Sequence, residues 1–207
     1  MSYFFDLNHL APPPSRQKAL KFFWCLFGNN NPLVVEIGSG NGHFLTEYAA
    51  LVPEHNFIGT EILGGRARKF HSKVEKRRLG NVAIIKGDAR RFVWEFLYKQ
   101  MVEEFITMFP DPWPKKRHHK KRLIQVPLVN MLKTRLVHHG SISIVTDHSE
   151  YRDWIIQEFE KAGGFSSRFR QGYTSYPHSY YPQSLFEKRF RDQKKSMYVM
   201  EYRKTKN

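Results

Sequence analysis

The chain has 207 residues, of which 41% are hydrophobic and 15% aromatic, a composition that suffices for one globular domain with a full core. Its formal net charge of +15 favours a polyanionic partner, with nucleic acid as the first choice. No apolar run approaches the roughly 18 residues of a membrane-spanning helix, and the first ten residues lack the pattern of a signal peptide, so we expect a cytoplasmic protein.

The N-terminal segment is predicted to be an arm followed by one helix. Residues 1–15 end in three consecutive prolines, which favour an extended chain. Ser15 is a suitable N-cap for a helix over residues 16–27. Cys25 lies among aromatic residues of this helix, and we expect its thiol to be buried and inert.

From residue 33 onward, apolar runs typical of strands alternate with helical patterns. Strands are predicted at 33–37, 56–61, 82–85, 104–109 and 141–147. Helices are predicted at 43–51, 65–79, 90–98, 123–137 and 149–161. This alternation is typical of an α/β fold with a mostly parallel sheet and helices on both faces. Two later strands, at 168–173 and 197–202, would form an antiparallel edge hairpin and bring the sheet to seven strands.

A glycine turn follows the first of these strands. Gly38, Gly40 and Gly42 would allow the backbone to approach a ligand closely. The spacing differs from the dinucleotide fingerprint, and by itself a plain tight turn explains it equally well.

The strongest pattern is that all five strands end at or near a carboxylate: Glu36, Glu61, Asp88, Asp111 and Asp147. Ligands of open parallel sheets bind beyond the carboxyl ends of the strands, where these acids would gather. Glu61 lies 21 residues after Gly40, the distance at which a carboxylate meets ribose hydroxyls in such folds. So acidic a rim would repel a pyrophosphate but suits an adenosine with a cationic centre, as in S-adenosylmethionine. The alternative is a set of solvated acids at strand ends.

The fourth strand leads into a proline-rich loop, 109–114, and then into a basic run, 115–122. Its three prolines exclude a helix or an inner strand and make the loop stiff. The run holds six Lys or Arg, two His and no acid, which suits a phosphate backbone. Asp111 and Trp113 would then hold a base, although Trp113 fits a packing role equally well. The alternative is a proline turn before a solvated basic segment.

A metal site is not expected. The pairs His118-His119 and His138-His139 are adjacent residues whose side chains tend to point apart, and one cysteine offers no thiolate cluster.

Taken together, these motifs resemble the bacterial tRNA (guanine-N7-)-methyltransferases. The resemblance covers residues 33–203 and rests on segments in the same order, namely 35–42, 59–61, 87–89, 109–115 with the basic run, 146–147 and 184–187. The proline-aspartate-tryptophan segment is its specific part, since the glycine turn alone fits any class I methyltransferase. One departure is Ser184, where the family usually has threonine.

The resemblance implies a Rossmann-like class I methyltransferase domain over residues 33–207, behind an N-terminal arm and helix over 1–32. It implies methyl transfer from S-adenosylmethionine to N7 of a guanine in tRNA, at guanine 46 of the variable loop. Asp111 matches the catalytic residue. The positions that match cofactor contacts are Glu36, Gly38, Gly40, Glu61, Asp88 and Asp111. Those that match substrate contacts are Lys115, Asp147, Ser184 and Glu187, and the RNA-contacting run is Arg117, His118, His119, Lys120, Lys121 and Arg122.

Two other functions stay open from the sequence. One is a class I methyltransferase that acts on another nitrogen of nucleic acid or protein. The other is a basic RNA-binding module without catalysis. The sequence leaves the oligomeric state open as well.

Overall fold

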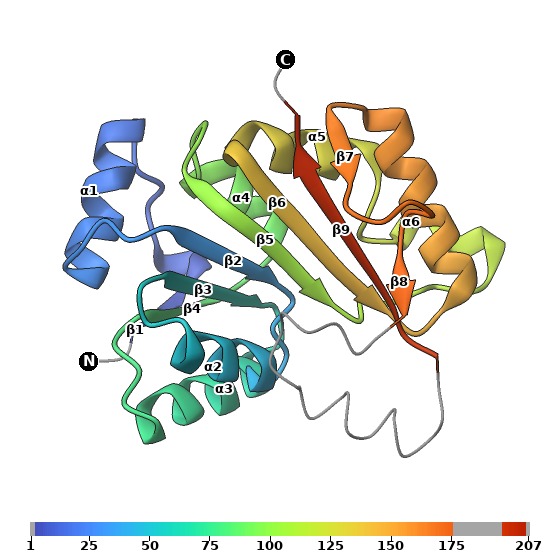
Figure 1. Cartoon of the computed structure of the whole chain (residues 1–207). Helices are drawn as coiled ribbons and strands as arrows, with labels where there is room; N and C mark the ends of the chain where they lie inside the picture. The colour runs from blue at the N-terminus through green and yellow to red at the C-terminus, as the bar shows by residue number, and fades with distance from the viewer. Residues whose placement is uncertain (1–2, 176–195, 206–207) are drawn as a thin grey trace.

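A nine-stranded, mostly parallel sheet runs through the part of the chain that the computed structural model describes, residues 3–175 and 196–205 (Figure 1). Its strands are β1 (Tyr3–Asp6), β2 (Leu33–Ile37), β3 (Asn56–Glu61), β4 (Val82–Lys86), β5 (Val102–Met108), β6 (Leu136–Thr146), β7 (Phe165–Ser167), β8 (Thr174–Ser175) and β9 (Tyr198–Lys204). The order across the sheet is β1-β4-β3-β2-β5-β6-β9-β7, with β8 paired to β9. Strands β1 to β6 pair in parallel, whereas β9 is antiparallel to β6, β7 and β8.

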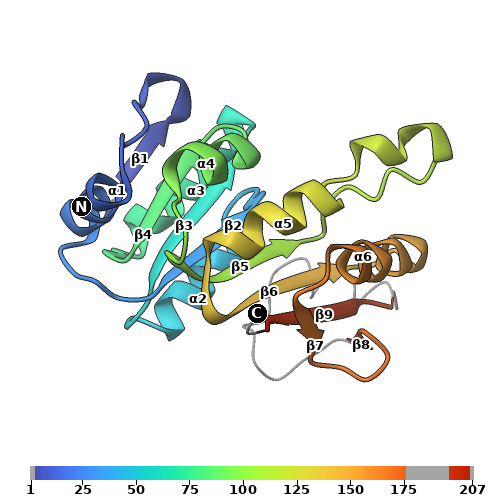
Figure 2. The same ribbon diagram turned by 90° about the horizontal axis from the view of Figure 1, so that it is seen from above.

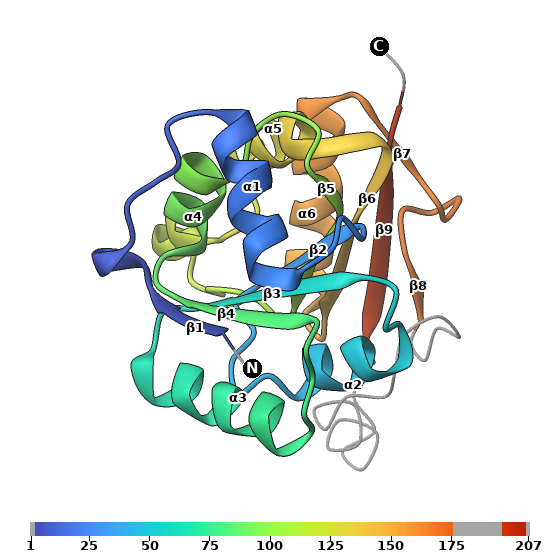
Figure 3. The ribbon, with the colours of Figure 1, turned by 90° about the vertical axis from the view of Figure 1, so that its left-hand side faces the viewer.

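Helices cover both faces of this sheet (Figure 3). The α-helices are α1 (Arg16–Phe27), α2 (His43–Leu51), α3 (Gly64–Lys76), α4 (Ala89–Phe96), α5 (Val126–Arg135) and α6 (Ser149–Ala162), and the 3₁₀ helices are η1 (Leu7–His9) and η2 (Lys116–Lys121). The larger core cluster joins α1, α4, α5 and α6 to one face, and a smaller cluster joins α2 and α3 to the other. Among the described residues, no helix is long and apolar enough to cross a membrane.

The α/β class, the parallel sheet and the antiparallel edge are as predicted, but the sheet has nine strands rather than seven. Strands β1, β7 and β8 were not predicted; β1 lies in the segment expected to be an extended arm, and it pairs in parallel with β4. Residues 168–173, predicted as a strand, form the turn between β7 and β8 instead. The helix predicted over 123–137 is α5, and the chain turns into β6 already at Leu136. The predicted N-cap is confirmed, since the Ser15 hydroxyl accepts from the Lys18 amide at 3.3 Å.

The strand order brings the carboxyl ends of β2 to β6 to one edge of the sheet. Strand β2 lies at the centre, so Glu36 sits between Gly59 of β3 and Ile106 of β5. Figure 2 shows the loop after β5 projecting past the strand ends at this edge.

Candidate active site

A cleft of about 560 Å³ opens at this edge of the sheet. It brings together Gly38, Glu61, Asp88 and Asp111, which come from four different strand ends. The acids at the strand ends were predicted to gather at this edge, and Glu61, Asp88 and Asp111 do line the cleft. Trp113, Lys121 and Leu123 close the side of the cleft that the loop after β5 forms.

Glu61, the last residue of β3, ties two backbone segments together. Its Oε2 accepts from the Gly40 amide at 2.9 Å, and its Oε1 accepts from the Leu63 amide at 2.8 Å. The carboxylate therefore links the glycine turn to the N-terminus of α3. A carboxylate has about four lone-pair positions, so each oxygen can still accept a hydroxyl donor from a ligand.

The glycine turn packs against an aromatic ring of α3. Gly42 has φ +69°, and a Cβ at this position would lie 1.9 Å from the ring of Phe70. In β3, a Cβ at Gly59 would lie 2.2 Å from the same ring and 2.6 Å from the hydroxyl oxygen of Ser39. Both positions need glycine, because the turn, β3 and α3 approach one another so closely.

Glu36 lies beneath the glycine turn and is only 2% exposed. Burial raises the pKa of its carboxyl to about 7; the Ser39 hydroxyl opposes this rise, and the charge of Glu61 adds to it. Among the described residues, its Oε2 has no hydrogen-bond partner. A buried carboxyl oxygen without a donor is costly, and a cation or N–H group of a ligand would offset that cost.

Asp88 follows β4 and is the N-cap of α4. Its Oδ1 accepts from the amides of Arg90 and Arg91 at 2.7 and 3.4 Å. Both contacts use the same oxygen, and the half-exposed side chain lines the cleft.

Asp111 stands in the loop after β5, where its side chain is exposed to the cleft. On either side of it, Phe109 and Trp113 have φ of +54° and +43°. Bulky residues rarely adopt this left-handed conformation, which costs on the order of 1 to 3 kcal/mol each and needs support from the surroundings. The rings of Trp113 and His118 meet edge-on, with 5.7 Å between their centroids, and Lys121 Nζ lies 4.8 Å from the centroid of the Trp113 ring.

The basic run divides into an exposed and a packed part. Its exposed members are Lys115, Lys116, Arg117, Lys120 and Lys121. His119 is half-buried, with its Nε2 3.4 Å from Glu150 and its ring edge-on to Trp154. Arg122 is only 1% exposed and is bonded within the protein, so this structure leaves it no access to RNA and corrects its place in the expected RNA-contacting run.

The other expected site residues lie around the cleft rather than in its lining. Within the described residues, the lining of the cleft does not include Glu36, Gly40, Lys115 or Asp147. Ser184 and Glu187 fall outside the described residues, so their roles stay predictions.

Ile62, Leu63 and Arg90 line the cleft although the sequence analysis did not single them out. Ile62 and Leu63 are 63% and 53% exposed, which is unusual for large apolar side chains. Their signal in the sequence is a pair of apolar residues directly after the acid that ends β3. The flat face of a ligand ring would cover them.

These residues fit S-adenosylmethionine. Glu61 offers acceptors for ribose hydroxyls, the exposed apolar pair offers a surface for an aromatic ring, and the unpartnered Oε2 of Glu36 offers an acceptor for a cationic group. Within residues 3–175 and 196–205, no three His, Cys, Asp or Glu side chains are placed to hold a metal ion.

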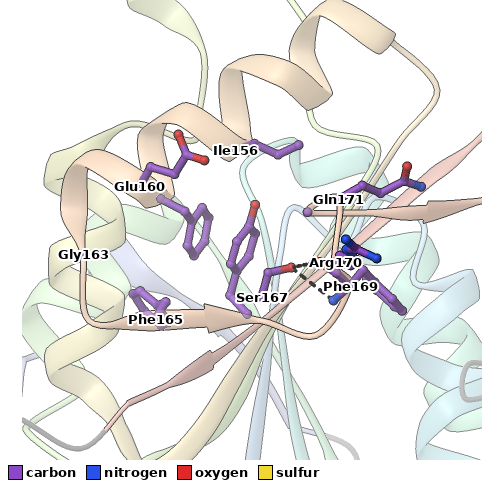
Figure 4. Close-up of a pocket in the computed structure, with 11 residues that line it drawn as sticks. Ile156, Glu160, Gly163, Phe165, Ser167, Phe169, Arg170 and Gln171 are labelled. Carbon is purple, nitrogen blue, oxygen red and sulfur yellow. Dashed lines mark hydrogen bonds between the residues drawn. The ribbon is translucent and has the colours of Figure 1, made fainter.

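A second hollow, of about 360 Å³, lies between α6 and the turn that joins β7 to β8 (Figure 4). Its lining mixes aromatic and polar residues, and Phe159 and Tyr202 are stacked there at 3.7 Å between ring centroids. It contains none of the expected site residues.

Sequence comparisons identify the family of this chain. A family model described as "Putative methyltransferase" matches residues 30–200. The tRNA (guanine-N(7)-)-methyltransferase of Syntrophotalea carbinolica is 31% identical over 98% of this chain and 84% of its own length. The enzyme of the same name from Halorhodospira halophila is 35% identical over 79% of this chain and 71% of its length. That from Chromohalobacter salexigens is 38% identical over 68% of this chain, and the match spans just over half, 57%, of that relative.

Solved structures support the fold. An antibiotic-related methyltransferase superposes with a TM-score of 0.66 at 15% identity, over 95% of this chain and 99% of that one. A 30S ribosomal A1408 methyltransferase from an uncultured bacterium gives a TM-score of 0.60 at 16% identity, over 94% of this chain and 98% of that one. At such identities only the fold is shown, and it is that of the class I methyltransferases. Because the sequence matches extend across the sheet and the cleft alike, the chain belongs to the tRNA (guanine-N7-)-methyltransferase family.

Proposed function

We propose that this protein methylates N7 of a guanine in tRNA, at guanine 46 of the variable loop. The observation that carries the proposal is the cleft in which Asp111 and Trp113 meet the acids Glu61 and Asp88, directly beside an exposed basic run. The names of the relatives supply the substrate class, because they are called tRNA (guanine-N(7)-)-methyltransferases.

The acidic end of the cleft would hold the cofactor. The carboxylate of Glu61 accepts the ribose hydroxyls, and the free face of Ile62 and Leu63 covers the adenine ring. Asp88 keeps one oxygen directed to its helix cap, so its second oxygen serves the exocyclic amine of adenine. Glu36 attracts the cationic end, where its buried charge is otherwise uncompensated.

The transfer itself requires no general base, because N7 of guanine already exposes a lone pair at neutral pH. When bound, S-adenosylmethionine would supply a sulfonium methyl group, which the N7 lone pair would accept while the C–S bonding pair remains on sulfur. The protein holds the two reactants in line, and positioning alone supplies several kcal/mol. Positive charge develops on the imidazole ring of the base, where the carboxylate of Asp111 stabilises it.

The RNA would be held by the other side of the cleft. The exposed cations of the run bind phosphates, and the indole of Trp113 offers a stacking surface for the base. Lys115 and Asp147 are the proposed substrate contacts within the described residues. Guanine presents two adjacent donors, N1–H and its amine, which a carboxylate such as Glu187 would accept together, with the Ser184 hydroxyl as a further contact.

We place the chemistry in residues 33–207. Residues 1–32 support it, because β1 extends the same sheet and α1 packs into the larger core cluster. The cytoplasm, where the proposed substrate is found, is the expected location.

The test is methylation of bulk unmodified tRNA with methyl-labelled S-adenosylmethionine, followed by nucleoside analysis. We expect the label in 7-methylguanosine, and we expect a tRNA transcript with adenine at position 46 to stay unlabelled. A label on an amino nitrogen would identify a different class I methyltransferase. Tight RNA binding without any transfer or cofactor binding would indicate a non-catalytic module, and either result would overturn the proposal.

A further inference from the structure

Arg122 ends the basic run, yet its guanidinium is buried inside the protein. Its Nε donates to the carbonyl of Pro112 at 2.9 Å, and its Nη2 donates to Oε1 of Glu150 at 3.0 Å. The guanidinium carbon lies 5.2 Å from the ring centroid of Tyr151 and 4.9 Å from that of Trp154. One planar cation thus joins the proline loop to the first turns of α6.

A packing role alone does not account for a buried arginine at this position. Burial of a cation is costly, and a long apolar side chain would fill the same space without that cost. Among the described residues, Nη1 of Arg122 has no hydrogen-bond partner, so the site does not even satisfy the whole group. The hydrogen bond from Arg122 is the main cause that lowers the pKa of Glu150, so this exposed carboxylate is kept charged as its partner.

The segment that follows Arg122 is fastened to the same helix. The Trp154 indole donates to the Ile124 carbonyl at 2.8 Å, and the Ile124 amide donates to the Tyr151 hydroxyl at 3.2 Å. The Val126 amide donates to Glu158 at 2.9 Å. Helix α6 therefore provides a fixed base from which Arg122 reaches back across ten residues to Pro112.

The carbonyl that Arg122 holds lies between Asp111 and Trp113. Trp113 has φ +43° although a proline follows it, a combination that the free chain disfavours. Phe109, at the start of the loop, has φ +54°. Such a backbone persists only where its surroundings fix it, and Arg122 holds the peptide carbonyl that directly precedes Trp113.

We propose that Arg122 is a positioning residue, which fixes the orientation of Asp111 and Trp113 by clamping the Pro112 carbonyl against α6. This inference rests on the proposed function for its effect on catalysis, but the clamp itself is a property of the loop. Lysine cannot replace Arg122, because only the planar guanidinium donates in two directions while it lies against two rings.

The test compares Arg122→Lys with Arg135→Lys as a matched control. Arg135 also lies over an indole, 5.6 Å from the ring of Trp94, and donates to a backbone carbonyl, but it is on the far end of α5. With saturating tRNA and cofactor, we expect Arg122→Lys to lower the single-turnover rate at least tenfold. The dissociation constant of S-adenosylmethionine should stay within twofold of the wild-type value. The slope of tRNA affinity against salt concentration should match that of the wild type. The control should keep the wild-type rate.

A second readout does not depend on activity. The amide of His118 donates to the carbonyl of Lys115 at 2.7 Å, and the amide of Arg122 donates to the carbonyl of His119 at 3.0 Å. Hydrogen exchange of these amides reports how well the loop is ordered. We expect exchange in peptides covering 109–122 to accelerate at least tenfold in Arg122→Lys, with β2 to β4 unchanged.

If Arg122→Lys does not fold, Glu150→Ala replaces it, because this partner is half exposed and its removal loosens the clamp without a buried cavity. Wild-type exchange in peptides covering 109–122 in the folded variant would overturn the proposal. Faster exchange in a protein that proves not to methylate tRNA would support the clamp and refute only the proposed function.

Discussion

The buried carboxyl of Glu36 is expected to make cofactor affinity depend on pH. Burial raises its pKa to about 7, and a cation bound at Oε2 favours the ionised form. Below pH 7 the free site holds a proton that binding must release, so affinity rises with pH. Only about one Glu36 in ten is ionised at pH 6, against about nine in ten at pH 8. The dissociation constant of S-adenosylmethionine should therefore be about tenfold larger at pH 6, a difference of ~1.4 kcal/mol.

Calorimetry measures this linkage directly. Titrations at pH 7 in two buffers of different ionisation enthalpy should show the release of about 0.5 proton by Glu36. The amino group of the cofactor titrates nearby, so the matched control is Glu36→Gln, which keeps the shape and the acceptor oxygen but cannot titrate. The difference between the two proteins isolates the carboxyl. Equal pH dependence in wild type and Glu36→Gln would refute the reasoning.

The same shift has a consequence for the stability of the free protein. The folded-state pKa of about 7 lies above the ordinary value of 4.5, so the folded state holds the proton more tightly. The contribution of Glu36 is fully present below pH 4.5 and is lost as pH rises through 7, by about 3 kcal/mol. Glu36→Gln should therefore be more stable than wild type at pH 8 in urea denaturation. This advantage should shrink as the pH is lowered through 7.

Three further variants, the last with a control, test other parts of the protein. Asp111→Asn should keep the fold and tRNA affinity but lower the single-turnover rate on the order of 10²-fold, since it removes charge and keeps an acceptor; a near wild-type rate would show that the charge is not needed. Joint replacement of Lys120 and Lys121 by Ala should flatten the salt dependence of tRNA binding by about 0.7 to 0.9 per lost phosphate contact, and an unaltered slope would mean a merely solvated surface. Gly42→Ala should lose about 2 to 4 kcal/mol of unfolding free energy in urea, because its Cβ would meet an aromatic ring at 1.9 Å and its φ is +69°. Gly65→Ala, with open space around it, is the control and should be neutral.

The alternating strands and helices and the acids at the strand ends could be predicted because their signals are local. Apolar runs, glycine turns and the N-cap at Ser15 each lie within a few residues, and the edge of a parallel sheet then brings the acids together. Strand β1 could not be found in this way. Its partner β4 lies 80 residues away, and its sequence ends near three prolines that suggest an extended arm.

Arg122 and Cys25 were misplaced for different reasons. Arg122 looks like one more cation of an exposed run, and its burial requires side chains from α6. Cys25 was expected to be buried, but it is exposed. The buried stripe of α1 is formed by Ala19, Phe23 and Leu26, and Cys25 lies outside this stripe. The burial of Arg122 could not be predicted from the local pattern, whereas the i, i+4, i+7 spacing of Ala19, Phe23 and Leu26 already leaves Cys25 off the buried stripe.

The two hydrogen bonds of Glu61 bear on the speed of cofactor binding. The carboxylate of Glu61 and the amides of Gly40 and Leu63 fix one another through contacts within the protein, so the binding surface is preorganised. The entropic cost of association then falls mainly on the ligand, and no slow rearrangement of the turn has to precede binding. In stopped-flow measurements, the observed rate should rise linearly with cofactor concentration in one phase. Replacement of Glu61 by Ala would free the turn and add a second, saturating phase.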